Sequence, residues 1–170
     1  QIVETSEDLG IADRTLILFV GDNGTHQSLT STLNGTSIRG GKGLMTDAGT
    51  RVPFVAMWPG TVPAGRVCDD LVDFSDFLPT TLEAIQATVP AGLDGQSFLP
   101  QLLGKPGKPR QWMHCYYCPR PEKIKPVRFV RDQRWKLYGS GQFFDVSSDP
   151  LEQRPLAKSA LKGTTAEAHR

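Results

Sequence analysis

Two short polar segments contain side chains that suit the binding of a cation and of an anion. Asp22 and Asn23 follow the apolar run at residues 16–20 after a single glycine. Their carboxylate and amide oxygens are ligands for a hard cation such as Ca²⁺. Lys42 lies in the glycine-rich segment at residues 39–43, where it brings a positive charge on a backbone that can approach a ligand closely. A bound cation and a lysine together would form a site for an oxyanion ester.

Each of these segments also has a plainer interpretation. Asp22-Asn23-Gly24 is a strong turn signal, and most such tripeptides are turns rather than metal sites. The glycines around Lys42 lack the spacing of a phosphate-binding P-loop. His26 follows Asp22 by four residues and could reach the same pocket, but a solvated loop histidine is the favoured interpretation.

The apolar run before Asp22 predicts the element that would position this site. Residues 16–20 are all apolar without alternation, which is typical of a strand covered on both faces in a parallel sheet. In open α/β sheets the ligand site lies just past the carboxyl ends of such strands. Residues 25–38 are mostly polar and predict a long loop without structure of its own, a feature that is usually functional in a compact domain.

Two further elements flank this strand in the sequence. Residues 1–11 read as the end of a helix that Gly10 terminates. Residues 52–58 predict a second buried strand, with Pro53 at its start, where a missing N–H is tolerated. The predicted fold class is therefore α/β.

A helix is predicted within residues 73–87. Asp76 is placed as its N-cap, so that the following proline falls in the first turn. Leu78, Leu82 and Ile85 are spaced at i, i+4 and i+7 and predict the face that packs on the core.

The C-terminal half predicts a small antiparallel sheet followed by a short terminal helix within residues 155–170. Its strands are short apolar segments separated by turn residues, which is typical of antiparallel pairing. They are expected at Trp112–Tyr117, Val127–Arg131, Trp135–Tyr138 and Gln142–Val146.

Several motifs follow one another in the sequence: Asp22-Asn23-Gly24, Arg39-Gly40-Gly41-Lys42-Gly43, Gly49-Thr50-Arg51-Val52-Pro53, Trp58-Pro59-Gly60, Arg134-Trp135-Lys136-Leu137 and the segment Phe144–Pro150. Taken in order, they resemble the type I sulfatases of the alkaline phosphatase superfamily. The resemblance covers most of residues 1–157. It implies that residues 1–95 end the α/β core and carry part of the metal and sulfate site, and that residues 96–170 form a C-terminal subdomain.

The resemblance also implies roles for individual residues. The family holds a calcium ion with an upstream aspartate pair, a downstream Asp-Asn pair and a formylglycine nucleophile; Asp22 and Asn23 match the downstream pair. Lys42 matches the lysine that contacts the sulfate ester, as a catalytic and substrate-binding residue. The family's histidine lies upstream, so its role is not transferred to His26. Arg51 is interpreted as a structural brace.

The formylglycine precursor, a Cys or Ser in the pattern C/S-x-P-x-R, is not found in this chain. Cys118 is followed directly by proline, and Glu122 stands where the arginine should be. We therefore expect the nucleophile upstream, in a longer protein of which this chain, starting without Met inside a predicted helix, is the C-terminal part. The chain alone is expected to be inactive.

Composition argues against some classes of binding partner. The net charge of +1 without a basic block argues against nucleic acid, and no apolar run reaches the roughly 20 residues of a membrane span. Cys115 and Cys118 have C-x-x-C spacing, but further zinc ligands are lacking, so we interpret them as apolar residues of a strand. The resemblance implies a periplasmic, secreted or lysosomal location.

The function predicted from sequence is hydrolysis of a sulfate ester of a carbohydrate or aryl alcohol. One alternative is a phosphoester or phosphonate hydrolase of the same superfamily. The metal sites of those enzymes usually add histidine ligands, and the lack of a histidine ligand adjacent to Asp22 and Asn23 argues against this alternative. Another is an inert module that binds glycans. A C/S-x-P-x-R segment upstream would decide between them.

Overall fold

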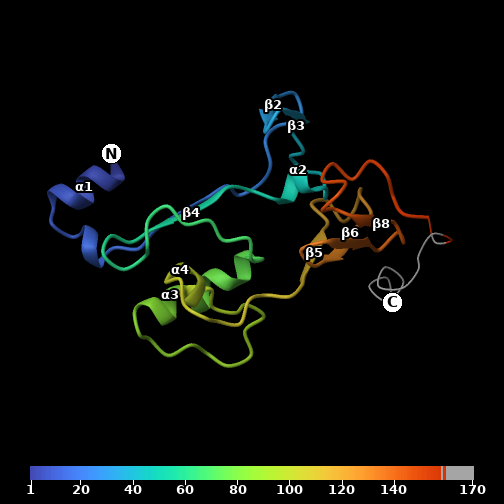
Figure 1. The fold of residues 1–170 in the computed structure, drawn as a ribbon. Helices are drawn as coiled ribbons and strands as arrows, with labels where there is room; N and C mark the ends of the chain where they lie inside the picture. The colour runs from blue at the N-terminus through green and yellow to red at the C-terminus, as the bar shows by residue number, and fades with distance from the viewer. Residues whose placement is uncertain (158, 160–170) are drawn as a thin grey trace. The chain divides into compact units, whose positions relative to one another are not determined.

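The computed structural model describes residues 1–157 and 159 (Figure 1). Contacts divide the chain into two compact units, unit 1 with residues 1–20 and 53–110, and unit 2 with residues 21–52 and those from 111 onward. The segment that carries Asp22 and Lys42 therefore groups with the C-terminal strands. The division predicted between residues 95 and 96 stays a prediction, and the predicted terminal helix lies largely outside the described residues.

Unit 1 begins with helix α1 (Ile2–Asp8), which ends as the sequence predicts. Gly10 has φ +64°, and its N–H donates to the carbonyl of Glu7 at 2.9 Å. The N–H of Ile11 donates to the carbonyl of Ser6, also at 2.9 Å, which completes a Schellman motif. A 3₁₀ turn, η1 (Ala12–Arg14), then leads to the first strand.

Strand β1 (Ile17–Val20) pairs antiparallel with β4 (Phe54–Met57). This pairing differs from the parallel arrangement expected from the apolar run. Phe19 and Val55 lie opposite each other in the register and are 65% and 59% exposed, so the pair is not covered on both faces. An apolar run indicates that a strand packs against other elements, but the direction of its neighbour depends on the tertiary structure.

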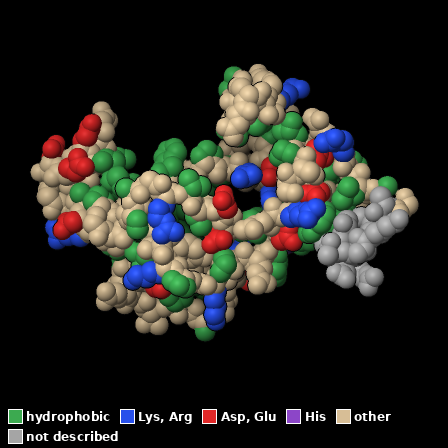
Figure 2. Space-filling model, in the orientation of Figure 1, with side chains coloured by type: hydrophobic (Ala, Val, Ile, Leu, Met, Phe, Trp, Pro, Cys, Tyr) green, Lys and Arg blue, Asp and Glu red, His purple; other side chains and the backbone are tan. Residues whose placement is uncertain are grey.

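Exposed apolar side chains on unit 1 lead to a prediction about the 170-residue chain on its own. Figure 2 shows apolar side chains at the surface beside α1 and over β4. An unpaired strand edge with such side chains is a template for association. We expect the chain to bind a hydrophobic dye and to self-associate in size-exclusion chromatography. Phe19→Thr combined with Val55→Thr should reduce both, whereas Leu33→Thr, an equally exposed control outside this pair, should have little effect. A monomer with a sharp thermal transition would contradict this expectation.

The core of unit 1 is built around three phenylalanines. Phe77 begins helix α3 (Phe77–Ala84), and its ring centroid lies 5.4 Å from that of Phe54 and 5.5 Å from that of Phe98. Phe98 precedes the short helix α4 (Leu99–Leu102) and is buried.

The predicted core face of α3 is wrong for Leu78 and Ile85, whereas Leu82 is half-buried. Leu78 is 52% exposed and Ile85 is 72% exposed, while Pro79 and Thr80 are the buried residues of the helix. Thr80 can be buried because its hydroxyl donates to the carbonyl of Asp76 at 2.6 Å and accepts from the N–H of Phe98 at 3.0 Å. Tertiary hydrogen bonding, rather than apolar spacing, decides which face of this helix packs.

Asp76 occupies the N-cap position of α3, as predicted, but its carboxylate does not cap that helix. It accepts instead from the N–H groups of Asp73 and Gln96, both at 2.8 Å, and pairs with the guanidinium of Arg110, whose Nε lies 2.9 Å away. The hydrogen bond to Asp76 raises the pKa of Arg110, against the opposing effect of burial. Asp73, by contrast, caps the 3₁₀ turn η2 (Phe74–Asp76) through the N–H of Ser75.

Unit 2 contains the predicted antiparallel sheet, whose four strands follow one another in sequence order. They are β5 (Met113–Tyr117), β6 (Val127–Arg131), β7 (Trp135–Tyr138) and β8 (Phe143–Asp145). Phe129, Phe143, Phe144 and Val146 are buried in its core. The predicted strand positions are confirmed, because each strand lies between local turn signals that the sequence displays.

The predicted loop at residues 25–38 is wrong, because much of it forms a hairpin of β2 (Thr30–Leu33) and β3 (Thr36–Arg39). Asn34 and Gly35 have φ of 49° and 78°, as a two-residue type I′ turn requires. The Asn34-Gly35 pair was the sequence signal that could have predicted this hairpin. A short helix, α2 (Asp47–Thr50), follows. None of the described helices has the length and apolar character needed to cross a membrane.

Candidate functional site

Two backbone hydrogen bonds join the segment that contains Asp22 and Asn23 to residues 39–51, the longer segment that contains Lys42. The N–H of Gly24 donates to the carbonyl of Gly49 at 2.9 Å, and the N–H of Lys42 donates to the carbonyl of Thr25 at 2.9 Å. The two polar segments that the sequence singled out therefore lie side by side within unit 2.

Glycine is required where these segments meet. A Cβ on Gly24 would lie 2.0 Å from the carbonyl oxygen of Ala48, and one on Gly49 would lie 2.1 Å from that of Leu44. A Cβ on Gly41 would lie 2.6 Å from the carbonyl carbon of Ala48. Since these neighbours are backbone atoms, a side chain at any of the three positions would displace the backbone packed against it, and at Gly24 it would force the two segments apart.

Asp22 and Asn23 form the oxygen-bearing side of the candidate site. Asp22 is exposed and Asn23 is half-buried. The Asn23 side-chain amide donates to Asp22 Oδ1 at 2.9 Å, so the two side chains lie together. The donors fit Ca²⁺ in kind, because both residues supply hard oxygens. Within the described residues, no group of three or more His, Cys, Asp and Glu side chains is arranged to hold a metal.

Lys42 combines a fixed backbone with an exposed side chain. Its N–H is bound by Thr25, as described, and its carbonyl accepts from Gln27 Nε2 at 2.9 Å. Gly43 follows with φ +84°, a conformation that other residues adopt rarely. In the part of the chain that the structure describes, the Lys42 ammonium has no ion-pair partner. Such a lysine can meet an external anion.

His26 and Arg51 lie on the same two segments. The His26 ring is exposed, and its Nδ1 lies 2.8 Å from the hydroxyl of Ser28 and accepts from the N–H of Ser28 at 3.2 Å. These contacts hold the ring within its own loop. The possibility that His26 reaches the substrate pocket, named above beside the favoured solvated histidine, stays a prediction. The Arg51 N–H donates to the carbonyl of Asp47 at 2.8 Å, and its side chain is exposed.

The cysteines of the C-x-x-C pair have separate surroundings. Cys115 Sγ lies 3.8 Å from the sulfur of Met45, and Cys118 Sγ donates to the carbonyl of Ile124 at 3.4 Å. Cys115 belongs to β5, as the interpretation as a strand residue predicts.

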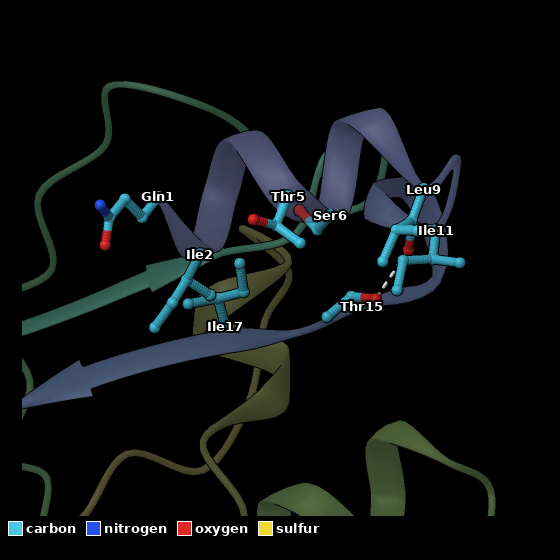
Figure 3. Close-up of a pocket in the computed structure, with 8 residues that line it drawn as sticks. All are labelled: Gln1, Ile2, Thr5, Ser6, Leu9, Ile11, Thr15 and Ile17. Carbon is cyan, nitrogen blue, oxygen red and sulfur yellow. Dashed lines mark hydrogen bonds between the residues drawn. The ribbon is translucent and has the colours of Figure 1, made fainter.

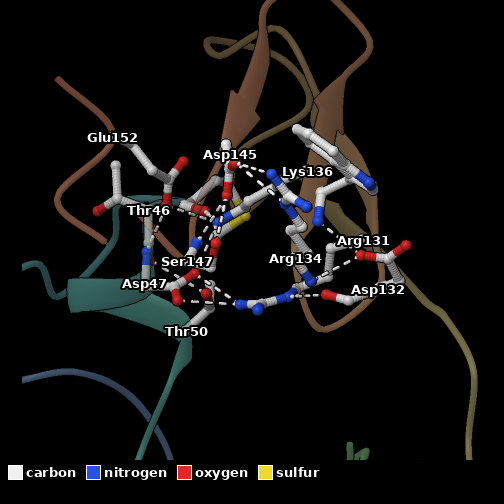
Figure 4. Close-up of polar contacts among 12 residues, drawn as sticks. Thr46, Asp47, Thr50, Arg131, Asp132, Arg134, Lys136, Asp145, Ser147 and Glu152 are labelled. Atoms are coloured by element: carbon white, nitrogen blue, oxygen red, sulfur yellow. Dashed lines mark hydrogen bonds and ion pairs between the residues drawn. The ribbon is translucent and has the colours of Figure 1, made fainter. Parts of the chain in front are cut away.

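Sequence reasoning missed a buried polar cluster next to the Lys42 segment, made of Asp47, Arg131, Lys136, Glu152 and Tyr138. Figure 4 shows the first four of these residues. One sequence signal could have pointed to this cluster: side-chain alternation within β7 places Lys136 and Tyr138 on the same face of the sheet. The partners could not be found, since Asp47 and Lys136 are 89 positions apart.

Unit 1 has an open groove of about 330 Å³ between α1 and the start of β1 (Figure 3). Its walls consist of apolar and uncharged polar side chains, which do not suit a sulfate or phosphate ester. They come from Gln1, Ile2, Thr5, Ser6, Leu9, Ile11, Thr15 and Ile17.

Comparisons with known proteins show what this chain is similar to. Residues 41–166 match the family described as "N-sulphoglucosamine sulphohydrolase, C-terminal". The chain is 35% identical over 150 residues to human arylsulfatase A, covering 84% of this chain and 29% of that protein. It is 29% identical over 166 residues to an ulvan-active sulfatase of Formosa agariphila, covering 96% of this chain and 30% of that protein. The chain thus spans about 30% of the length of these relatives.

A solved structure shows the same fold. A protein whose structure was solved in complex with its substrate D-glucosamine-2-N,6-O-disulfate matches with a TM-score of 0.77 and 23% identity, over 98% of this chain and 35% of that one. The fold class, an α/β core portion with an antiparallel subdomain, is confirmed by this likeness.

Proposed function

We propose, since the chain belongs to the N-sulphoglucosamine sulphohydrolase C-terminal family, that the whole protein hydrolyses sulfate esters and that this chain supplies part of its active site. The observation that carries the proposal is the pair of backbone hydrogen bonds that bring the Asp22–Asn23 segment against the Lys42 segment. A hard-cation site beside an exposed lysine suits an ester with several anionic oxygens.

Asp22 and Asn23 are proposed to bind calcium through their side-chain oxygens. Because Ca²⁺ takes 6–8 oxygen ligands, the remaining ligands and the formylglycine nucleophile, derived from Cys or Ser, would come from residues beyond this chain. When bound, the ion would act as a Lewis acid on a sulfate oxygen. The contribution of this chain is to hold two oxygen donors in place.

Lys42 is proposed to donate a hydrogen bond to the sulfate ester. Cleavage of the S–O bond builds negative charge on the leaving oxygen, and a donor aimed there stabilises the transition state more than the substrate. The backbone bonds of Lys42 to Thr25 and Gln27 support this role, because they hold the base of the side chain in one position. His26 is a weaker candidate for contact with substrate.

The substrate class is proposed to be a sulfated carbohydrate or an aryl sulfate. The relatives' names support both, since one is an ulvan-active sulfatase and another an arylsulfatase. A periplasmic, secreted or lysosomal location is proposed on the same family resemblance.

The decisive experiment compares substrates with the whole protein. We expect a chromogenic aryl sulfate to be hydrolysed faster than the matching aryl phosphate and aryl phosphonate, with activity lost on chelation of calcium. Faster turnover of the phosphonate or phosphate would favour the hydrolase alternative of the same superfamily. Binding of a sulfated glycan without any turnover would favour an inert glycan-binding module.

The 170-residue chain on its own is proposed to supply only part of the calcium ligands, which leads to a prediction about its calcium affinity. Asp22 and Asn23 offer few of the 6–8 oxygens that Ca²⁺ needs, so binding should be weak, in the millimolar range or above. Isothermal titration calorimetry measures this, with Asp22→Ala as the matched control. Tight, stoichiometric binding would show that the site is complete within this chain and would overturn the assignment of its missing ligands.

A further inference from the structure

The inference concerns Lys136, a lysine of β7 whose side chain has no exposed surface. Its ammonium donates to the carbonyl of Met45 at 2.8 Å, to Glu152 Oε1 at 2.8 Å and to Asp47 Oδ1 at 3.2 Å (Figure 4). These three bonds use all the donors that an ammonium has. Its Nζ also lies 4.3 Å from the centroid of the Phe129 ring, a cation–π distance.

The two carboxylates that meet Lys136 have further partners. Arg131 Nη1 donates to both oxygens of Asp47, at 2.8 and 2.9 Å. The Tyr138 hydroxyl lies within hydrogen-bonding distance of Glu152 Oε2 and 2.9 Å from the Met45 carbonyl. Burial, followed by the hydrogen bond to Glu152, raises the pKa of Tyr138, so its hydroxyl keeps its proton and acts as a donor. Two cations thus balance two carboxylates.

The backbone of the segment that follows Lys42 is the part held by these groups. The Met45 carbonyl accepts from Lys136, and the Asp47 N–H donates to Glu152 Oε1 at 2.7 Å. Glu152 itself has φ +53°, a conformation that costs a non-glycine residue free energy and persists where the surroundings impose it. Residues 45–47 are therefore clamped between a strand and the turn that contains Glu152.

Stability alone does not explain such a cluster. Replacing a buried ion pair by apolar groups of similar size is often neutral or stabilising, so burial of these charges is weak grounds for a stabilising role. What the cluster does provide is one defined position for the backbone of residues 45–47.

The backbone position of residues 45–47 constrains Lys42 through the turn that connects the two. The N–H of Leu44 donates to the carbonyl of Gly41 at 2.7 Å, and on the other side the N–H of Lys42 is bound by Thr25. We propose that Lys136 and Glu152 are positioning residues that set the place of Lys42 in the active site. This inference rests on the proposed function, in which Lys42 contacts the sulfate ester.

The test uses the whole protein with Lys136→Met combined with Glu152→Gln, which removes one positive and one negative charge together. Lys136→Met alone should lower the Tm, because it leaves an uncompensated carboxylate in a buried site. The double variant should regain the Tm, yet its kcat on a chromogenic aryl sulfate should stay about 10- to 100-fold low, since a displacement of about 1 Å can cost 10²-fold. Its KM should change by less than about threefold, well below the loss in kcat.

A second readout does not depend on activity. Amide hydrogen exchange of residues 41–49 should be faster in the double variant than in the wild type, while exchange in β5 and β6 stays unchanged. Tyr138→Phe, which removes only the hydroxyl that meets Glu152 and Met45, should produce the same pattern to a smaller extent without loss of fold.

The matched control removes a more exposed charge pair close to Lys136 in the same sheet. Arg134→Met with Asp145→Asn deletes the pair joined at 2.9 Å, whose arginine side chain is 58% exposed, and should leave kcat and the exchange of residues 41–49 unchanged. Wild-type kcat and exchange in the Lys136 double variant would overturn the inference. A wild-type protein without sulfatase activity would instead overturn the proposed function, while the exchange data still decide whether Lys136 and Glu152 hold the segment.

Discussion

Lys42→Ala in the whole protein is expected to lower kcat by about 10² to 10³, the scale of losing one donor that stabilises a developing oxyanion. The effect should fall on kcat, because the interaction strengthens as charge accumulates on the leaving oxygen. The variant should fold normally, since the Lys42 side chain is exposed and its structural bonds are made by its backbone.

Lys42→Arg should restore little of this activity. The guanidinium is a planar fork, which does not place a compact point charge where an ammonium does. Kinetics on a chromogenic aryl sulfate measure both variants, with Lys123→Ala as the control at an exposed lysine of unit 2. If Lys42 is only a solvated loop residue, both substitutions will leave kcat within about twofold. Near-wild-type turnover of Lys42→Ala would remove Lys42 from the site.

Asp22→Ala in the whole protein is expected to abolish sulfatase activity while sparing the fold. Its carboxylate is the one charged calcium ligand that this chain is proposed to supply, and a hard cation depends on such oxygens. Asp22 is exposed and its carboxylate accepts a hydrogen bond from the side chain of the neighbouring Asn23, so the free energy of unfolding should change by no more than about 0.5 kcal/mol.

Activity, calcium dependence and thermal unfolding measured together test this expectation. Any residual activity of Asp22→Ala should need more calcium than the wild type does, whereas Asp8→Ala, at the exposed end of α1, should behave as the wild type. Full activity with an unchanged calcium requirement would show that Asp22 is a turn residue and not a ligand.

Elements whose signals are local were predicted well from the sequence. Val127–Arg131 and Trp135–Tyr138 are strands with the expected bounds, and Gly10 ends the first helix. Local turn chemistry and side-chain alternation suffice for such elements, because the residues that determine them are close together in the chain. The hairpin at residues 30–39 belongs to the same class, since its Asn34-Gly35 turn is a local signal that the interpretation as a loop overlooked.

The motifs of the candidate site were also visible in the sequence, as Asp22, Asn23 and Lys42. Only the structure placed their segments side by side, through the bonds of Gly24 to Gly49 and of Thr25 to Lys42. The glycines of this segment suggested close approach of the backbone in general. The backbone atoms that they approach, those of Thr25 and His26 for Gly40 and of Ala48 for Gly41, are not identified by any spacing rule.

Features that depend on distant partners were decided by the tertiary structure. The antiparallel pairing of β1 with β4 and the role of Asp76 toward Arg110 both follow from contacts between segments that are far apart in the chain. The burial of Lys136 is the clearest case. A lysine is rarely fully buried, and it becomes so here because Met45, Asp47 and Glu152 satisfy its three donors from two other segments. The free energy of a buried charge depends on all its neighbours at once, and a linear pattern does not contain that information.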